Sequence, residues 1–454
     1  MRSLSSTATL LSICVLACNN VGAFFVPLAS LRNCGVRHRM VATSEENIPL
    51  DAATTTTSSL SEQSRRSALQ RLLTVATATS SFSLFPTAAF ANDDKVHISA
   101  YWKAVDGLNS LDEGKKLVSF DSSAYKAMMD DPARTPFFET AIINRLNSAP
   151  GGPGSQTVLD LGTGPFALFA IIAAQAGARK VYAIEANSKA VRSARITVKK
   201  LGFSNIIEIV EGLSNEITLP EKADFAVAEI VGSIASEEGL YATILDAHRR
   251  LVKEPSNPSN WIPSRVQTYA APASYGLHNL FQPPAFDWTK LNGEPVRFNC
   301  RDEGLQLLSD PVLIEDISFA NIKPDATNKK KIKFIIDGER IEDNTSSFYE
   351  EFRRARLAEG EAEKMAKTTA ASLTGIALWP RLILDGEGSI EVNSRAFPTG
   401  GHQKSHWQTV LPIMSELPVP VKGGDEIEVN INFDVSSDLQ VPPTYSLDGD
   451  VIRK

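Results

Sequence analysis

The chain has 454 residues, of which 22% are charged and 43% hydrophobic, and its formal net charge is −7. No run approaches the roughly 18 apolar residues of a membrane-spanning helix, so we expect a globular protein without membrane insertion. The acidic balance argues against non-specific binding of nucleic acid. Three of the four cysteines lie in the first 34 residues, which leaves Cys300 alone. The sequence after residue 34 therefore excludes a disulfide framework or a cysteine-rich zinc site, and we expect no metal.

Residues 1–91 have the composition of a targeting presequence. They contain no lysine, seven arginines and four acids, among many Ser, Thr and Ala. An apolar stretch precedes Ala23-Phe24, which resembles the signal-to-transit junction of plastid proteins in algae with extra plastid membranes. Arg65-Arg66, followed by a weakly apolar stretch and Ala89-Phe90-Ala91, resembles a twin-arginine export signal. We expect a plastid location, in the thylakoid lumen if the second signal is used; the alternative is a disordered tail.

Cleavage after Ala91 would leave 363 residues with a net charge of −10, because the presequence carries +3. That length suffices for two domains. Residues 92–154 have a mostly helical pattern that ends in a break rich in Pro and Gly, and we expect an N-terminal helical segment there.

Residues 155–262 alternate short apolar runs with helical patterns, which predicts a Rossmann-like α/β domain with a parallel sheet. The strand candidates are residues 158–161, 181–184, 206–210 and 225–228. Residues 263–454 change to two-residue alternation broken by Gly and Pro, which predicts an antiparallel β-barrel. We expect one helical insertion in this barrel, from about Ser347, with Glu350 completing a capping box, to about Ala371.

A glycine turn follows the first predicted strand, at Gly162 and Gly164, and opens a helix. Glu185 ends the next strand, where a carboxylate can accept both hydroxyls of a ribose. A dinucleotide site would need a small residue after these glycines for its pyrophosphate, but Phe166 crowds the turn. The turn therefore favours S-adenosylmethionine, which has no phosphate; a sheet turn without a ligand is the alternative.

Two carboxylates, Glu229 and Glu238, flank a loop between a strand end and a new helix. An acidic residue such as Glu238 is also common near a helix N-terminus, where it interacts with the helix dipole. Glu229 is harder to explain structurally, since an ionised group at the end of an apolar strand needs a cationic partner.

Four motifs, in order, make the chain resemble the protein arginine methyltransferase family over almost all of its length after residue 91. They are the helix motif at residues 125–135, the glycine turn, the double-glutamate loop, and Ser405-His406-Trp407. Residues 247–252 and 308–312 are closer to the branch associated with monomethylarginine. The resemblance implies an S-adenosylmethionine-dependent enzyme that methylates a guanidinium nitrogen of arginine in a protein substrate.

The resemblance also assigns roles to residues. Glu229 and Glu238 would be catalytic, clamping the substrate guanidinium so that one nitrogen faces the methyl group. The cofactor would contact Arg134, Asp160, Gly162, Gly164, Glu185, Ser214 and Asn215, with Arg134 on its carboxylate. The acceptor pocket would contain Met128, His406 and Trp407. The structural alternatives are a surface ion pair for Arg134, plain core for Met128, and a buried barrel loop for His406 and Trp407.

Two positions depart from the family pattern. Phe166 stands at a position usually occupied by a small residue, and Asn215 stands where the family usually has a glutamate that contacts adenine. These departures motivate one alternative, a non-catalytic scaffold with the same fold. A second alternative keeps the cofactor site but methylates a small molecule. The resemblance also allows a homodimer, and residues 277–305 are one candidate for its arm, although their apolar pattern is irregular.

Overall fold

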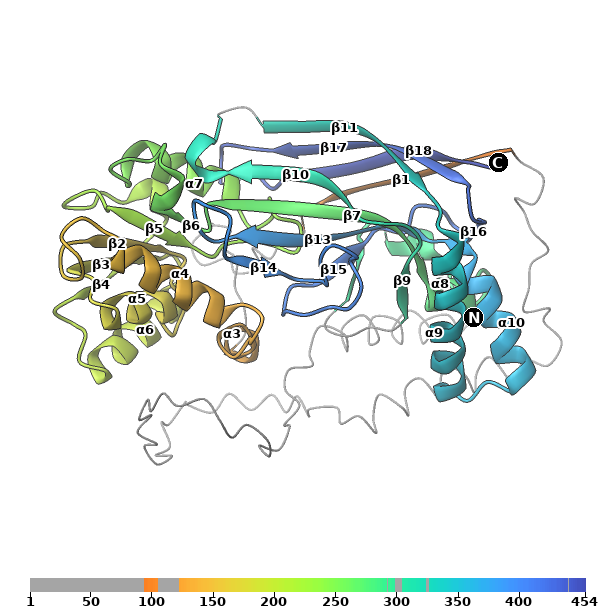
Figure 1. Cartoon of the computed structure of the whole chain (residues 1–454), viewed down its shortest axis with the longest axis horizontal. Coiled ribbons are helices and arrows are strands. Elements are labelled where there is room, and N and C mark those ends of the chain that lie inside the picture. Colours follow the sequence, from red (N-terminus) through yellow and green to blue (C-terminus); the bar gives the residue numbers. More distant parts are fainter. Residues whose placement is uncertain (1–93, 105–121, 292, 299–303, 324–325, 440) are drawn as a thin grey trace, which may run out of the picture.

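The computed structural model describes residues 94–104, 122–291, 293–298, 304–323, 326–439 and 441–454 (Figure 1). The predicted presequence and Cys300 lie outside these ranges. One end of the molecule holds the parallel sheet and its helices, and long antiparallel strands extend from it (Figure 1). Among the described residues, no helix combines the length and the apolar character needed to cross a membrane.

A five-stranded parallel sheet forms the Rossmann-like part, in the order β4-β3-β2-β5-β6. Its strands are β2 (Thr157–Leu161), β3 (Lys180–Glu185), β4 (Ile207–Glu211), β5 (Phe225–Ala228) and β6 (Trp261–Ile262). The four predicted strands are confirmed within a residue or so at each end. The strand order reverses between β2 and β5, and sheets of this kind bind their ligands at such a switch point, beyond the carboxyl ends of the strands.

Five helices belong to this part of the chain. They are α3 (Ser122–Met129), α4 (Thr135–Asn147), α5 (Leu168–Gln175), α6 (Ser188–Lys200) and α7 (Leu240–Arg250). Apolar residues of α4, α5, α6 and α7 share one core with the sheet, in which Phe138 of α4 stacks on Phe169 of α5 with ring centroids 4.7 Å apart. This packing fixes the start of α4, and with it Arg134, beside the glycine turn.

The barrel part contains two larger antiparallel sheets. One has the order β1 (Lys95–Lys103), β18 (Thr444–Ile452), β17 (Glu426–Val435) and β11 (Ala326–Ile335). The other has the order β10 (Val312–Ser318), β7 (Arg265–Tyr275), β13 (Gly375–Ile383), β15 (Thr409–Leu411) and β8 (Val296–Phe298). The shorter strands are β9 (Leu305–Leu307), β14 (Glu391–Asn393), β12 (Ser372–Leu373) and β16 (Val419–Pro420). The barrel prediction is confirmed, and β8 ties part of the candidate arm into the second sheet.

The prediction of an N-terminal helical segment is wrong for Lys95–Lys103. This stretch is strand β1, which pairs with β18 along its whole length, from Lys95 opposite Ile452 to Lys103 opposite Thr444. Val96, Ile98 and Trp102 are buried at two-residue spacing, whereas the residues between them face solvent or are half-buried. Burial of one strand face on the barrel core outweighs the helical pattern of the residues that follow. The barrel therefore includes a strand from before the Rossmann-like part.

The predicted single helix at residues 347–371 is also wrong. Two helices occupy this region, α9 (Gly338–Arg354) and α10 (Glu359–Ala370), near the short α8 (Gly276–Leu280) (Figure 1). The helix begins nine residues before Ser347, because Asp337 caps it by accepting hydrogen bonds from the backbone of residues 339 and 340. Phe348 and Phe352 of α9 are buried against α10, so each helix covers the apolar face of the other.

Candidate active site

The glycine turn and the double-glutamate loop meet at the switch point of the parallel sheet. The turn follows β2 and the loop follows β5, and these strands are neighbours with Leu161 opposite Ala228. Since parallel strands end at the same edge, the two segments lie beside each other at that edge. Both segments are recognisable in the sequence, and the topology brings them together.

The glycines of the turn are required by their backbone and by their neighbours. Gly162 and Gly164 have φ angles of 73° and 66°, a region that other residues rarely adopt. A Cβ atom on Gly162 would lie 2.8 Å from the side chain of Ile230, and one on Gly164 would lie 3.4 Å from the ring of Tyr125. The turn thus packs closely against both α3 and the double-glutamate loop.

Glu185 and Asp160 are bonded to this turn. Glu185 accepts hydrogen bonds from the backbone N–H of Gly164 at 2.9 Å and of Asn187 at 2.8 Å, and burial raises its pKa. Asp160 accepts bonds from Thr163 Oγ1 at 2.5 Å and Ala170 N–H at 3.1 Å, and burial raises its pKa to about 7. Asp160 is only 1% exposed, so its observed contribution is to hold the turn.

Ser214 and Asn215 lie on a short 3₁₀ turn after β4. Ser214 is buried, and its carbonyl accepts a hydrogen bond from Arg250 Nη2 at 2.8 Å. Arg250, on α7, is itself paired with Asp246 at 2.6 Å, and this brace for the turn was not predicted. Asn215 is exposed, which leaves its side chain accessible to a ligand bound at the switch point.

Arg134 and Glu229 form a buried ion pair through Nη2 and Oε2, with side chains 6% and 7% exposed. The Nη1 atom of Arg134 donates to the carbonyl of Met128 at 2.9 Å, and its guanidinium lies 4.9 Å from the ring centroid of Phe169. This pair supplies the cationic partner that Glu229 needs, and it rules out the surface ion pair considered for Arg134. The Nε atom of Arg134 is buried without a hydrogen-bond partner, so the guanidinium has an unused hydrogen-bond donor.

Glu238 sits in a left-handed backbone conformation, with φ at 61°, just before α7. Burial, and then the negative charges of Glu229 and Glu237, raise its pKa to about 8, while Arg297 lowers it. A carboxylate in this setting is stabilised by a further cation. Two acids that the chain holds near each other therefore create a site suited to a positively charged group.

His406 joins this site through Asp131, a contact between residues that are 275 positions apart. Oδ2 of Asp131 lies 2.7 Å from Nδ1 of His406 and accepts the backbone N–H of His406 at 2.8 Å. Burial acts to raise the pKa of Asp131, but the hydrogen bonds from His406 and Ala133 outweigh it, and the pKa is lowered. Asp131 lay in a predicted motif without an assigned role. Met128 is half-buried on α3 within the same group.

Trp407 agrees in part with the structural alternative of a buried barrel loop, since it is only 3% exposed. Its Nε1 atom donates to the carbonyl of Val231 at 2.7 Å, and the next residue, Gln408, donates its N–H to Ser233 Oγ at 3.1 Å. Trp407 therefore attaches the barrel loop to the double-glutamate loop. This attachment places His406 at the edge of the site.

The residues fit S-adenosylmethionine by their chemistry. Gly162 and Gly164 place no side chain in the turn, Arg134 has an unused buried donor, and Glu185 stands at the end of the strand beside the turn. Within the described ranges, no group of three or more His, Cys, Asp or Glu residues is arranged to hold a metal ion.

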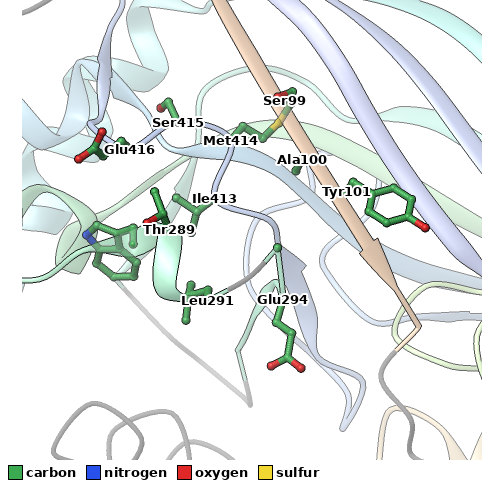
Figure 2. Close-up of a pocket in the computed structure, with 12 residues that line it drawn as sticks. Ser99, Ala100, Tyr101, Thr289, Leu291, Glu294, Ile413, Met414, Ser415 and Glu416 are labelled. Atoms are coloured by element: carbon green, nitrogen blue, oxygen red, sulfur yellow. The ribbon is translucent and has the colours of Figure 1, made fainter. Parts of the chain in front are cut away.

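A separate cavity of about 410 Å³ lies in the barrel part (Figure 2). Its walls come from β1, from the 3₁₀ turn Trp288–Leu291 and from residues 413–416. None of the predicted site residues lines it. The candidate active site is therefore at the switch point of the parallel sheet, not at this cavity.

Comparisons with known proteins agree with this geometry. The family described as ribosomal protein L11 methyltransferase (PrmA) matches residues 146–246. Protein arginine N-methyltransferase PRMT10 of Arabidopsis thaliana is 27% identical over 315 residues, covering 67% of this chain and 78% of that protein. Protein arginine N-methyltransferase 6 of Danio rerio is 30% identical over 207 residues, covering 43% of this chain and 55% of that protein.

A solved structure shows the same fold. It is the Trypanosoma brucei PRMT1 enzyme–prozyme heterotetrameric complex with AdoHcy, with a TM-score of 0.50 and 18% sequence identity. The similarity covers 68% of this chain and 87% of that chain.

Proposed function

On the premise that this chain belongs to the protein arginine N-methyltransferase family, we propose how its site transfers a methyl group to a substrate arginine. S-adenosylmethionine is the cofactor, and when bound it supplies an electrophilic sulfonium methyl group. The acceptor is a guanidinium nitrogen of arginine in a protein substrate. The observation that carries the proposal is the pair Glu229 and Glu238, whose mutual repulsion a guanidinium would relieve.

The two glutamates have different roles in this proposal. Glu229 is already held by Arg134, so its orientation is fixed before the substrate arrives. Glu238 has the raised pKa, so binding of a cationic guanidinium draws it into its ionised form. Arginine stays protonated at any accessible pH, and carboxylates on two sides orient one of its nitrogens and bias positive charge away from it. Positioning and electrostatics then lower the barrier without a covalent intermediate.

Arg134, Glu185 and Asn215 are the residues that would hold the cofactor. The guanidinium of Arg134 suits a carboxylate, Glu185 can accept ribose hydroxyls, and the amide oxygen of Asn215 can accept an amine proton. The contact that Arg134 makes with Glu229 links this half of the site to the acceptor half.

The test uses labelled S-adenosylmethionine with arginine-rich and lysine-rich peptides, and compares the wild type with Glu229→Gln. We expect label on arginine peptides only, and its loss in the variant. No transfer to arginine peptides despite intact cofactor binding would refute the proposal and favour a scaffold. Transfer that survives Glu229→Gln would refute the mechanism.

We also propose that the product is monomethylarginine, supported by the resemblance of residues 247–252 and 308–312 to that branch. Acid hydrolysis of the labelled peptide and separation of the methylated arginines tests this. Dimethylarginine as the main product at long incubation times would contradict it.

We propose plastid delivery by residues 1–91, on the composition and paired signals of that segment. A fluorescent fusion of these residues, with and without Arg65→Lys and Arg66→Lys, should enter the plastid in both forms and reach the lumen only with both arginines. Diffuse cytosolic fluorescence would contradict the proposal.

We further propose a homodimer, as the family resemblance allows, and sedimentation of the full chain at several concentrations tests it. A single species of monomer mass throughout would contradict it.

A further inference from the structure

The loop that carries Glu238 is attached to the barrel by hydrogen bonds. The backbone N–H of Ala235 donates to Thr268 Oγ1 on β7 at 3.0 Å. The hydroxyl of Ser236 lies 3.1 Å from the hydroxyl of Tyr445 on β18. Both contacts are buried, so strands that lie far from the loop in sequence determine its shape.

Arg297 on β8 makes a charged contact with the same loop. Its Nη2 atom lies 2.6 Å from Oε1 of Glu237, and its Nη1 atom lies 3.3 Å from Oε2. The side chains are 16% and 6% exposed, so this two-point ion pair is largely shielded from water. Glu237 also accepts the backbone N–H of Ile234 at 3.1 Å, which closes the loop on itself.

The loop is shaped around the carboxylate of Glu237. A Cβ atom on Gly232 would lie 2.3 Å from the Cβ of Glu237 and 2.9 Å from its Oε2 atom, so a side chain at residue 232 would displace it. Glu238 follows directly, in its left-handed conformation. A displacement of Glu237 therefore moves the backbone from which the Glu238 side chain extends.

Charge in this region is unevenly divided. Glu238 faces the carboxylates of Glu229 and Glu237 and the guanidinium of Arg297. Arg297 also faces Tyr445. Behind the loop, the carboxyl of Glu315 on β10 accepts a hydrogen bond from Thr268 at 2.6 Å and faces Glu237. Arg297 thus contributes a barrel-borne positive charge to a group of acids.

We propose that Arg297 is a positioning residue for methyl transfer: by pairing with Glu237 it fixes the orientation of Glu238 and offsets part of the negative charge around it. Because it acts through Glu237, it contacts neither substrate nor cofactor. The inference rests on the proposed function of the glutamate pair. It gives the barrel a role in methyl transfer, because Arg297 belongs to strand β8. Arg297 lies outside all four motifs of the family resemblance.

Arg297→Met, Arg297→Lys and the double variant Glu237→Gln/Arg297→Met test this inference in the full chain. The double variant removes both charges, and so it avoids the unpaired buried Glu237 that can prevent Arg297→Met from folding. Labelled S-adenosylmethionine and an arginine-rich peptide give kcat and KM from pH 6 to pH 10. Equilibrium dialysis measures cofactor affinity separately.

We expect Arg297→Met to lower kcat by about 10- to 100-fold, because a displaced clamp loses alignment, while cofactor affinity changes less than about twofold. The pH at which kcat/KM reaches half its maximum should rise by about one unit, since a cation near Glu238 is lost. Arg297→Lys should restore that midpoint but only part of kcat, because an ammonium does not reproduce the two-point contact. The double variant should keep the midpoint near that of the wild type and have a low kcat.

Wild-type kcat in Arg297→Met or in the double variant would overturn the inference and leave the proposed function intact. An unchanged pH midpoint in Arg297→Met would overturn the electrostatic part. Absence of transfer to arginine by the wild type would overturn the proposed function, and this inference with it.

Discussion

The two halves of the proposed active site are built differently. Apart from Arg134, the cofactor half comes from one stretch, residues 160–216, and its polar groups largely bond to each other, as Glu185 does with Gly164. The acceptor half takes Asp131, Glu238, Arg297 and His406 from separate regions, and it keeps a surplus of negative charge. A half whose polar groups bond to each other keeps a fixed shape, whereas a half with surplus negative charge has affinity for a cation. The comparison predicts that changes in the two halves affect different measurements.

The largest effect is expected in the acceptor half. Glu238→Gln removes the charge that a guanidinium would neutralise, and we expect kcat/KM for arginine peptides to fall by about 100- to 1,000-fold. Cofactor affinity, measured by equilibrium dialysis, should stay within about twofold. Glu359→Gln is the matched control, because Glu359 is exposed on α10 at the other end of the barrel part. Equal losses in Glu238→Gln and Glu359→Gln would show that the effect is not specific to the acceptor half.

In the cofactor half, Gly162→Ala should lower cofactor affinity by about tenfold or more, because the new methyl group meets Ile230 at 2.8 Å. Gly202→Ala is the matched control: its φ angle is 81°, and nothing lies within 4 Å of the added Cβ atom. Both variants carry a similar backbone cost, so thermal midpoints should fall in both. Loss of cofactor binding in Gly202→Ala as well would assign the effect to general destabilisation.

A pH profile separates the halves without a mutation. With a pKa of about 8 in the free site, Glu238 is mostly protonated at pH 6, and arginine binding needs its ionised form. We expect kcat/KM to rise by about tenfold per unit below pH 8 and to level off above it. Cofactor affinity should not follow this curve. A flat kcat/KM between pH 6 and pH 8 would contradict the role of Glu238.

The same raised pKa affects stability. An acid whose pKa rises from 4.5 unfolded to about 8 folded binds its proton more tightly in the folded state, so stability is lost as pH rises between these values. The Glu238→Gln variant has no carboxyl group at this position and does not lose stability in this way. The thermal midpoint of the variant minus that of the wild type should increase from pH 5 to pH 9, and a constant difference would argue against the raised pKa.

The smallest effect is expected for Asn215→Ala. Asn215 is exposed and can offer only a neutral acceptor to the cofactor, so its loss should weaken cofactor binding by less than about fivefold. The kcat at saturating cofactor should be unchanged. A complete loss of binding would show that this turn contributes more than its exposure indicates.

Sequence reasoning identified Gly162, Gly164 and Glu185 because a glycine turn between a strand and a helix is a local pattern. It also recognised that Glu229 needed a cation, but it assigned Arg134 to the cofactor alone, since a contact across 95 residues leaves no local signal. Arg297 was missed for the same reason: it lies in an irregular stretch, and its partner Glu237 is 60 residues away. Strand β1 was missed although its two-residue alternation is visible, because the barrel that buries it begins much later in the sequence.

The pairing of β1 with β18 has a consequence for biosynthesis. Residues 95–103 leave the ribosome long before their hydrogen-bonding partner, residues 444–452, has been synthesised. Until then, the apolar side chains of Val96, Ile98 and Trp102 lack their native cover, and the strand edge is open to other chains. A nascent or truncated chain that stops before Thr444 therefore exposes residues 95–103 as an unpaired, aggregation-prone strand.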